Sequence, residues 1–120
     1  KNFIFIKSLG QKRYFEFLKV VDGVIGNSSS GVHEVPNFKI GSINIGNRQD
    51  GRIKLKSVIN VNYSQKKIIN SIKKISTKSF KKSIANIKNP YLKKNTTINI
   101  KNKIKEILKK KISIEKKFHE

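Results

Sequence analysis

The chain of 120 residues contains no cysteine, methionine or tryptophan, and only two histidines. Without cysteine, neither a disulfide framework nor a thiolate metal site can form, and two histidines do not make a metal site. No apolar run reaches the length of a membrane-spanning helix, and no secretory signal is visible. We therefore expect a cytoplasmic protein with no metal and no membrane partner.

Acidic side chains are also scarce. Seven aspartates and glutamates stand against 28 lysines and arginines, which gives a formal net charge of +21. Such a charge attracts polyanions, so a basic nucleic-acid-binding protein is one hypothesis. Only three of the basic residues are arginines, and arginine is the side chain that usually contacts phosphates and base edges in pairs of hydrogen bonds. We therefore favour a solvated lysine coat, densest in residues 61–120, and expect no nucleic-acid partner.

Strands and helices are predicted to alternate along the chain. Four short apolar runs are predicted to be strands: residues 3–6, 24–25, 43–45 and 58–61. Ser64 is the predicted N-cap of a helix with an isoleucine face, and further helices are predicted over about residues 79–87 and around residues 100–108. This alternation predicts an α/β fold, a Rossmann-like parallel sheet flanked by helices, on which ligands bind at the carboxyl ends of the strands.

The run Gly26-Asn27-Ser28-Ser29-Ser30-Gly31 lies at such an end, between a predicted strand and a predicted helix. Hydroxyls, backbone N–H groups and the positive end of a helix dipole in one place suit a phosphate. A capped helix start is the purely structural alternative. A Walker phosphate loop does not fit, because Val32-His33 stands where that loop needs Lys-Ser/Thr, and no Gly-x-Ser-x-Gly register exists for a hydrolase nucleophile.

Two charged residues belong to the same candidate site. Glu34, one turn into the predicted helix, is suited to accept hydrogen bonds from a ribose diol, or else is only a favourable charge in the first turn. Arg48 lies in the polar loop after the run 43–45 and is placed to offer positive charge to a diphosphate, or else is merely solvated. His33 is interpreted as a surface or rim residue.

Two motifs of the chain match a known family. The serine run with Glu34, and the segment Ile43-Asn44-Ile45-Gly46-Asn47-Arg48-Gln49-Asp50-Gly51-Arg52, closely resemble the C-terminal half of hydrolysing UDP-N-acetylglucosamine 2-epimerases. The likeness extends to Ser8-Leu9-Gly10 with Tyr14, to Asn89-Pro90-Tyr91 and to Lys116-Lys117-Phe118. It implies a glycosyltransferase-B-like enzyme of two Rossmann-type halves with the nucleotide sugar between them. This chain would be the UDP-holding half, and the N-terminal half would be missing.

The resemblance also implies which residues bind UDP. The diphosphate would contact Ser28 and Ser29, the uridine ribose would be held by Glu34, and Arg48 would lie against UDP. Leu9 or one of its neighbours would approach the uracil. The complete set of implied UDP-binding residues is Ser28, Ser29, Ser30, Gly31, Glu34 and Arg48.

The reaction implied by the resemblance converts UDP-N-acetylglucosamine and water to N-acetylmannosamine and UDP, for sialic or related nonulosonic acid biosynthesis. It proceeds by elimination of UDP to a glycal, followed by addition of water with inversion at C2. In the family the acid and base residues come largely from the other half, so no catalytic residue is expected in this chain, and no cofactor is implied. The full-length protein is expected to be a homo-oligomer, and a UDP-sugar glycosyltransferase is the alternative function.

By the same likeness the chain divides into two parts. Residues 1–88 would be the N-terminally truncated UDP-binding half, and residues 89–120 a C-terminal crossover helix with a basic tail. We expect the apolar face of that helix to lack full cover in this chain alone. The chain departs from the family at residues 40–42, where a Gly-x-Pro turn is usual, and at residues 92–94, where a Gly-Asp-Gly-like turn is usual.

Overall fold

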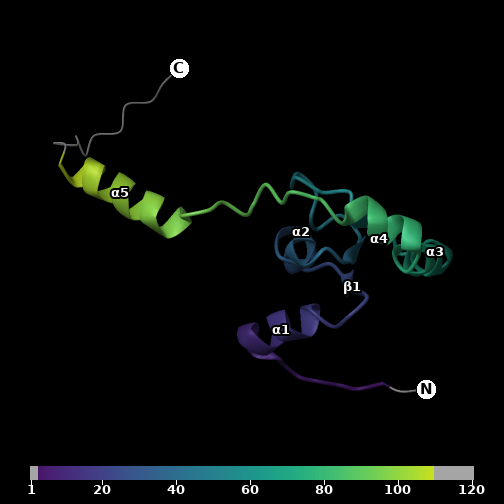
Figure 1. The fold of residues 1–120 in the computed structure, drawn as a ribbon. Coiled ribbons are helices and arrows are strands. Elements are labelled where there is room, and N and C mark those ends of the chain that lie inside the picture. Colours follow the sequence, from purple (N-terminus) through teal and green to yellow (C-terminus); the bar gives the residue numbers. More distant parts are fainter. Residues whose placement is uncertain (1–2, 110–120) are drawn as a thin grey trace.

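A sheet of three parallel strands forms the centre of the computed structural model, which describes residues 3–109 (Figure 1). The strands are β1 (Gly23–Gly26), β2 (Gly41–Ile45) and β3 (Val58–Val61), in the order β1-β2-β3. Ile25 is paired with Ile43, which is paired in turn with Ile59. The predicted α/β fold with a parallel sheet is therefore confirmed, and three of the four predicted strands form.

Helices precede, separate and follow the strands. They are α1 (Gly10–Leu18), α2 (Ser30–His33), the 3-10 helix η1 (Val35–Phe38), α3 (Gln65–Ile75), α4 (Lys78–Ile84) and α5 (Thr96–Leu108). The N-cap prediction for α3 is confirmed, because the Ser64 hydroxyl accepts a hydrogen bond from the backbone N–H of Lys67. Helix α4 begins one residue earlier than predicted, after an N-cap at Thr77, and ends at Ile84 rather than at residue 87.

The hydrophobic core lies between the sheet and the corner formed by α3 and α4. Its buried members are Ile43, Ile75, Phe80 and Ile84. Ile75 packs directly on strand backbone, since a Cβ atom on Gly23 or Gly41 would lie 2.5 or 2.6 Å from its side-chain atoms. Glycine at both positions is thus a packing requirement, and the isoleucine side chains of β2 fill the space beside it.

The opposite face of β2 is polar. Ser42 and Asn44 alternate with the core isoleucines along the strand and are each only 2% exposed. This face is covered by α2 and η1, which bury Val32 and Val35 completely. The run of residues 26–31, here called the serine turn, therefore lies on the polar face of the sheet and not on its apolar core.

The prediction of a strand at residues 3–6 was wrong. This segment has no regular structure, and Phe3, Ile4 and Phe5 are between 87% and 93% exposed. A strand forms only where a neighbour satisfies its backbone groups, and none of the strands in the described part of the chain pairs with this segment. In Figure 1 the segment runs apart from the sheet.

Helix α5 stands away from the sheet at the end of an extended segment (Figure 1). No residue of α5 is buried, and Ile104 and Leu108 are 52% and 78% exposed. This confirms the expectation that its apolar face lacks full cover in this chain. Within residues 3–109, no helix is both long enough and apolar enough to cross a membrane.

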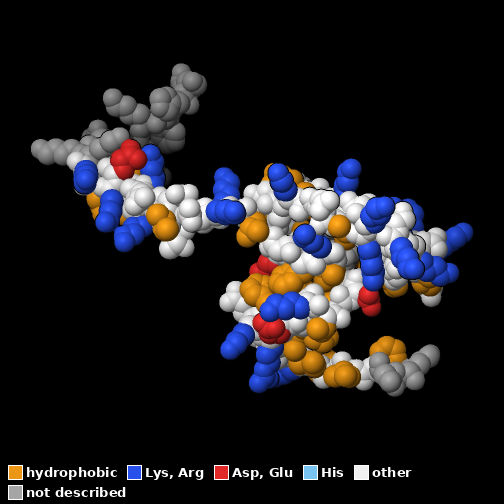
Figure 2. Space-filling model, in the orientation of Figure 1, with side chains coloured by type: hydrophobic (Ala, Val, Ile, Leu, Met, Phe, Trp, Pro, Cys, Tyr) orange, Lys and Arg blue, Asp and Glu red, His pale blue; other side chains and the backbone are white. Residues whose placement is uncertain are grey.

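Basic side chains cover the visible surface of α3, α4 and α5 without gathering into one patch (Figure 2). One of them forms an ion pair that joins the start of β1 to α4: the Lys81 ammonium donates to an Asp22 carboxylate oxygen at 2.7 Å. This hydrogen bond and the charge of Lys81 lower the pKa of the Asp22 carboxyl group.

Truncating the core should cost far more stability than truncating α5. We expect Ile43→Ala to lower the free energy of unfolding by about 2–5 kcal/mol, because it leaves a cavity against Ile75 and Ile84. The matched variant Ile100→Ala, at a position that is 55% exposed, should change it by less than about 0.5 kcal/mol. Urea denaturation followed by circular dichroism measures both, and equal losses would contradict the core assigned here.

Removing Lys81 should raise the pKa of Asp22. Because the folded-state pKa lies below the unfolded one, the ion pair stabilises the fold above the ordinary pKa of aspartate, and this contribution is lost as the pH falls through the lowered value. In Lys81→Ala the carboxyl titration followed by NMR should return toward the ordinary value. Lys82→Ala, on the same helix, should leave the pKa of Asp22 unchanged. If Asp22 has the same pKa in both variants, the ion pair with Lys81 is not what lowers it.

Candidate functional site

The serine turn lies at the carboxyl end of β1, as predicted, and presents unused hydrogen-bond donors. Ser28 and Ser29 are exposed. Among the described residues, no group accepts a hydrogen bond from the backbone N–H of either serine. The Ser28 hydroxyl oxygen accepts from the backbone N–H of Ser30 at 3.3 Å, but its O–H donates to no described residue. The O–H and backbone N–H groups of both serines are therefore available as donors to an oxyanion.

The helix after the turn contributes less than predicted. Helix α2 is only four residues long, and the N–H groups of Gly31, Val32 and His33 already bond to the carbonyl oxygens of Ser28 and Ser29. A macrodipole needs several aligned turns, so the helix-dipole part of the phosphate prediction is not supported. The ability to bind an anion therefore depends on the free hydrogen-bond donors of the turn itself.

The other two residues of the predicted turn are engaged within the chain. The Ser30 hydroxyl lies 2.6 Å from the Tyr14 hydroxyl of α1. Gly31 packs on β2, since a Cβ atom there would lie 2.7 Å from the Ser42 hydroxyl oxygen. Ser30 and Gly31 thus hold the turn between α1 and the sheet. Tyr14, which the family likeness included without a binding role, also contributes to this site.

A pocket of about 230 Å³ opens between the turn, α1 and the polar face of β2. It is lined by Tyr14, Val24, Ile25, Gly26, Asn27, Ser28, Gly31, Ser42 and Asn44. The structure therefore brings Ser28 and Gly31 to one cavity, together with polar residues of β2 that the sequence did not single out. Leu9, Glu34 and Arg48 are not among its lining residues.

Glu34 is distinguished by its lack of a partner. It lies at the junction of α2 and η1 and is half-buried. The other four carboxylates of residues 3–109 each form an ion pair with a lysine, in the pairs Glu16–Lys19, Asp50–Lys54, Asp22–Lys81 and Glu106–Lys103. Within the described part of this lysine-rich chain, only the Glu34 carboxylate has no ion pair.

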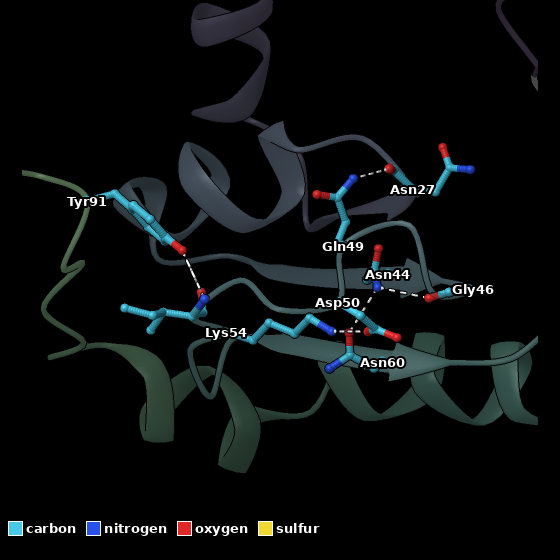
Figure 3. Close-up of polar contacts among 9 residues, drawn as sticks. Asn27, Asn44, Gly46, Gln49, Asp50, Lys54, Asn60 and Tyr91 are labelled. Carbon is cyan, nitrogen blue, oxygen red and sulfur yellow. Dashed lines mark hydrogen bonds and ion pairs between the residues drawn. The ribbon is translucent and has the colours of Figure 1, made fainter. Parts of the chain in front are cut away.

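Arg48 is exposed and makes no hydrogen bond or ion pair with a described residue. The loop that carries it is nevertheless held in place. The Gln49 side chain, 2% exposed, donates from Nε2 to the Asn27 carbonyl oxygen at 2.6 Å, and the Lys54 ammonium donates to Asp50 at 2.7 Å (Figure 3). No role of its own was predicted for Gln49, because a glutamine among exposed polar residues carries no local signal of burial.

A second pocket, of about 420 Å³, lies between this loop and the carboxyl ends of β2 and β3. Its lining residues are Gly46, Asn47, Asp50, Asn60, Val61, Asn62 and Tyr63. None of the residues predicted for UDP binding lines it. In the part of the chain described here, no group of three or more histidines and acidic residues is arranged to hold a metal ion.

Residues 89–91 connect His33, at the end of α2, to the arginine loop, the segment 46–53 that follows β2. The Asn89 side-chain amide donates to the carbonyl oxygen of His33 at 2.7 Å. The Tyr91 hydroxyl accepts from the backbone N–H of Ile53 at 3.0 Å and donates to its carbonyl oxygen at 3.3 Å (Figure 3). The Tyr91 ring stacks on the His33 ring at 4.2 Å, and the Arg52 guanidinium lies 3.3 Å from the same imidazole. His33, interpreted as a rim residue, is thus part of a structural clasp.

A three-stranded parallel sheet, helices on both of its faces and a donor-rich turn at a strand end define part of a Rossmann-like α/β domain. Residues 1–105 match the sequence profile of the UDP-N-acetylglucosamine 2-epimerase family, and the chain belongs to that family. The resemblance seen in the two motifs is therefore confirmed over most of the chain.

Three bacterial relatives are similar to this chain. Polysialic acid biosynthesis protein P7 of Escherichia coli is 37% identical over 119 residues, which are 99% of this chain and 30% of that protein. The GDP/UDP-N,N'-diacetylbacillosamine 2-epimerase (hydrolyzing) of Campylobacter jejuni is 37% identical over 76 residues, 63% of this chain and 19% of that protein. The UDP-N-acetylglucosamine 2-epimerase of Neisseria meningitidis is 35% identical over 71 residues, which are 59% of this chain and 19% of that protein. The chain thus spans less than a third of the length of each relative.

Loss of the Tyr91 hydroxyl should loosen the clasp. We expect Tyr91→Phe to lower the free energy of unfolding by about 0.5–1.5 kcal/mol, because the backbone of Ile53 loses its side-chain partner. Tyr63→Phe is the matched control, since the Tyr63 hydroxyl makes no hydrogen bond to a described residue. Urea denaturation compares the two variants, and an equal effect of both would show that the Tyr91 bond does not stabilise this region.

Proposed function

We propose that this chain is the nucleotide-sugar-binding part of a hydrolysing UDP-N-acetylglucosamine 2-epimerase, which converts UDP-N-acetylglucosamine and water to N-acetylmannosamine and UDP. Family membership supports the class of reaction. The names of the relatives from Escherichia coli and Campylobacter jejuni support a hydrolysing enzyme that serves sialic or related nonulosonic acids. The observation that carries the proposal is the pair of exposed serines with free backbone donors at the end of β1.

In this proposal the serine turn binds the diphosphate. Ser28 and Ser29 offer two backbone N–H groups and two hydroxyls to phosphate oxygens, while Ser30 and Gly31 keep the turn in place through Tyr14 and Ser42. When UDP leaves the sugar, negative charge grows on the departing phosphate. Donors that are already oriented toward that oxygen stabilise the transition state without reorganising.

In this proposal Glu34 and Arg48 also bind the nucleotide. The Glu34 carboxylate has no ion pair with any described residue, so both of its oxygens are free to accept hydrogen bonds from the ribose hydroxyls. The guanidinium of Arg48 is equally free and exposed, and its planar donors suit a diphosphate. The proposal assigns binding and leaving-group stabilisation to this chain, and the proton transfers to the remainder of the enzyme.

Titration calorimetry with UDP on this chain tests the proposal. We expect weak binding by the wild type and a loss of affinity on the order of tenfold or more in both Glu34→Gln and Arg48→Ala, since a hydrogen bond to a charged group contributes about 1.5–3 kcal/mol. We also expect no release of N-acetylmannosamine when UDP-N-acetylglucosamine is incubated with this chain by itself.

Two variants on α1 serve as controls for the change of charge. Glu16→Gln and Arg13→Ala remove the same kinds of side chain at exposed positions that do not line the pocket beside the turn. They should leave UDP affinity within about twofold of the wild type, after correction for the salt-dependent attraction that any change of net charge alters. Absence of UDP binding by the wild type, or equal affinities of all four variants, would refute the assignment.

A further inference from the structure

We infer that Gln49 is a positioning residue, which fixes the backbone that carries Arg48 and the Ser28 N–H group relative to each other for the phosphates of a nucleoside diphosphate. This inference rests on the proposed function and adds a residue that contacts no ligand. Its basis is one hydrogen bond between two loops that follow different strands: Gln49 Nε2 to the Asn27 carbonyl oxygen, at 2.6 Å (Figure 3).

The hydrogen bond from Gln49 orients the peptide group between Asn27 and Ser28. The carbonyl of Asn27 and the N–H of Ser28 belong to one peptide group, which is planar and trans, so they point in opposite directions. A donor that holds the carbonyl therefore aims the N–H of Ser28 away from Gln49. That N–H is one of the donors with no described acceptor. A hydrogen bond to the carbonyl also polarises the peptide and strengthens its N–H as a donor.

The loop that carries Arg48 is held by hydrogen bonds at its start and at its tip. The backbone N–H of Asp50 donates to the carbonyl oxygen of Asn47 at 2.9 Å, which places Arg48 and Gln49 at the two central positions of a turn. Arg48 is exposed, whereas Gln49 is buried. The start of the loop is fixed where the N–H of Gly46 donates to Val61, at 2.8 Å. With Gln49 bound to Asn27, the backbone that carries Arg48 is held at the tip of the loop as well.

The side chain of Gln49 is polar although it is buried. Gln49 is 2% exposed, and its Oε1 atom is buried without a partner among the described residues. A position that needed only to fill space would be apolar, because a buried amide is costly unless it is bonded. The required feature is thus the N–H donor of the amide. Ordering the arginine loop before the ligand arrives reduces the entropy that UDP binding must overcome.

A double-mutant cycle on UDP affinity, measured by calorimetry, tests this coupling. The variants are Gln49→Met, which keeps the size of the side chain and removes the donor, Arg48→Ala, and the two combined. We expect Gln49→Met to weaken UDP binding roughly tenfold in the wild-type background and less than about threefold in the Arg48→Ala background, because the residues act as one unit. Ser57→Ala, at another buried polar position, should not change UDP affinity.

The outcomes separate the inference from the function it rests on. If the wild type binds UDP and Gln49→Met binds it equally well, or loses the same factor with and without Arg48, the positioning role is refuted while the proposed function stands. If the wild type does not bind UDP, both the positioning role of Gln49 and the proposed function are refuted. Should circular dichroism show that Gln49→Met is unfolded, the cycle is run with Gln49→Asn. This variant keeps an amide but shortens its reach, and the same two results decide.

Discussion

The close packing of Ile75 on the backbone of β1 and β2 determines how the rest of this structure is arranged. The last residue of α3 lies where no side chain can stand on Gly23 or Gly41, so the helix presses directly against the two strands. The α3–α4 corner then covers Ile43 and encloses Ile84. Because side chains alternate along a strand, the apolar face of β2 is committed to this core, and its polar residues must face the other side. One contact thus separates the face that forms the core from the face that carries the candidate site.

The face that carries the candidate site is held together by hydrogen bonds between segments that are far apart in the chain. Asn44 donates to the Asn60 side chain at 2.9 Å, Gln49 reaches Asn27, and Asn89 reaches His33. Such buried polar networks fix orientation more strictly than apolar packing does, because each bond has a direction as well as a distance. The turn after β1 and the loop after β2 are consequently held as one surface, which is what a ligand that bridges two strand ends requires.

The sequence predicted those parts of the fold that local pattern controls. The runs at residues 24–25, 43–45 and 58–61 became strands, and Ser64 capped α3, because alternation and capping act within a few residues. The run at residues 3–6 has the same composition but no neighbour, and pairing is a nonlocal property that composition does not contain. For the site, the serine run was equally compatible with a capped helix, and the family resemblance favoured UDP. The contacts of Gln49 and Tyr91 span 22 and 38 residues, so no local pattern could have indicated them.

The large positive charge and the candidate site act on an anionic ligand in different ways. A net charge of +21 raises the concentration of any anion near the surface, and this attraction weakens as salt is added. It does not discriminate between a nucleotide and another polyanion, since the lysines are spread over the helices on the visible face (Figure 2). Discrimination requires groups at fixed positions, and a carboxylate is especially informative, because it repels phosphate but accepts hydrogen bonds from hydroxyls. Within residues 3–109, Glu34 is the one carboxylate without a lysine partner, and in the proposed function it favours a ligand that presents hydroxyl donors as well as phosphates.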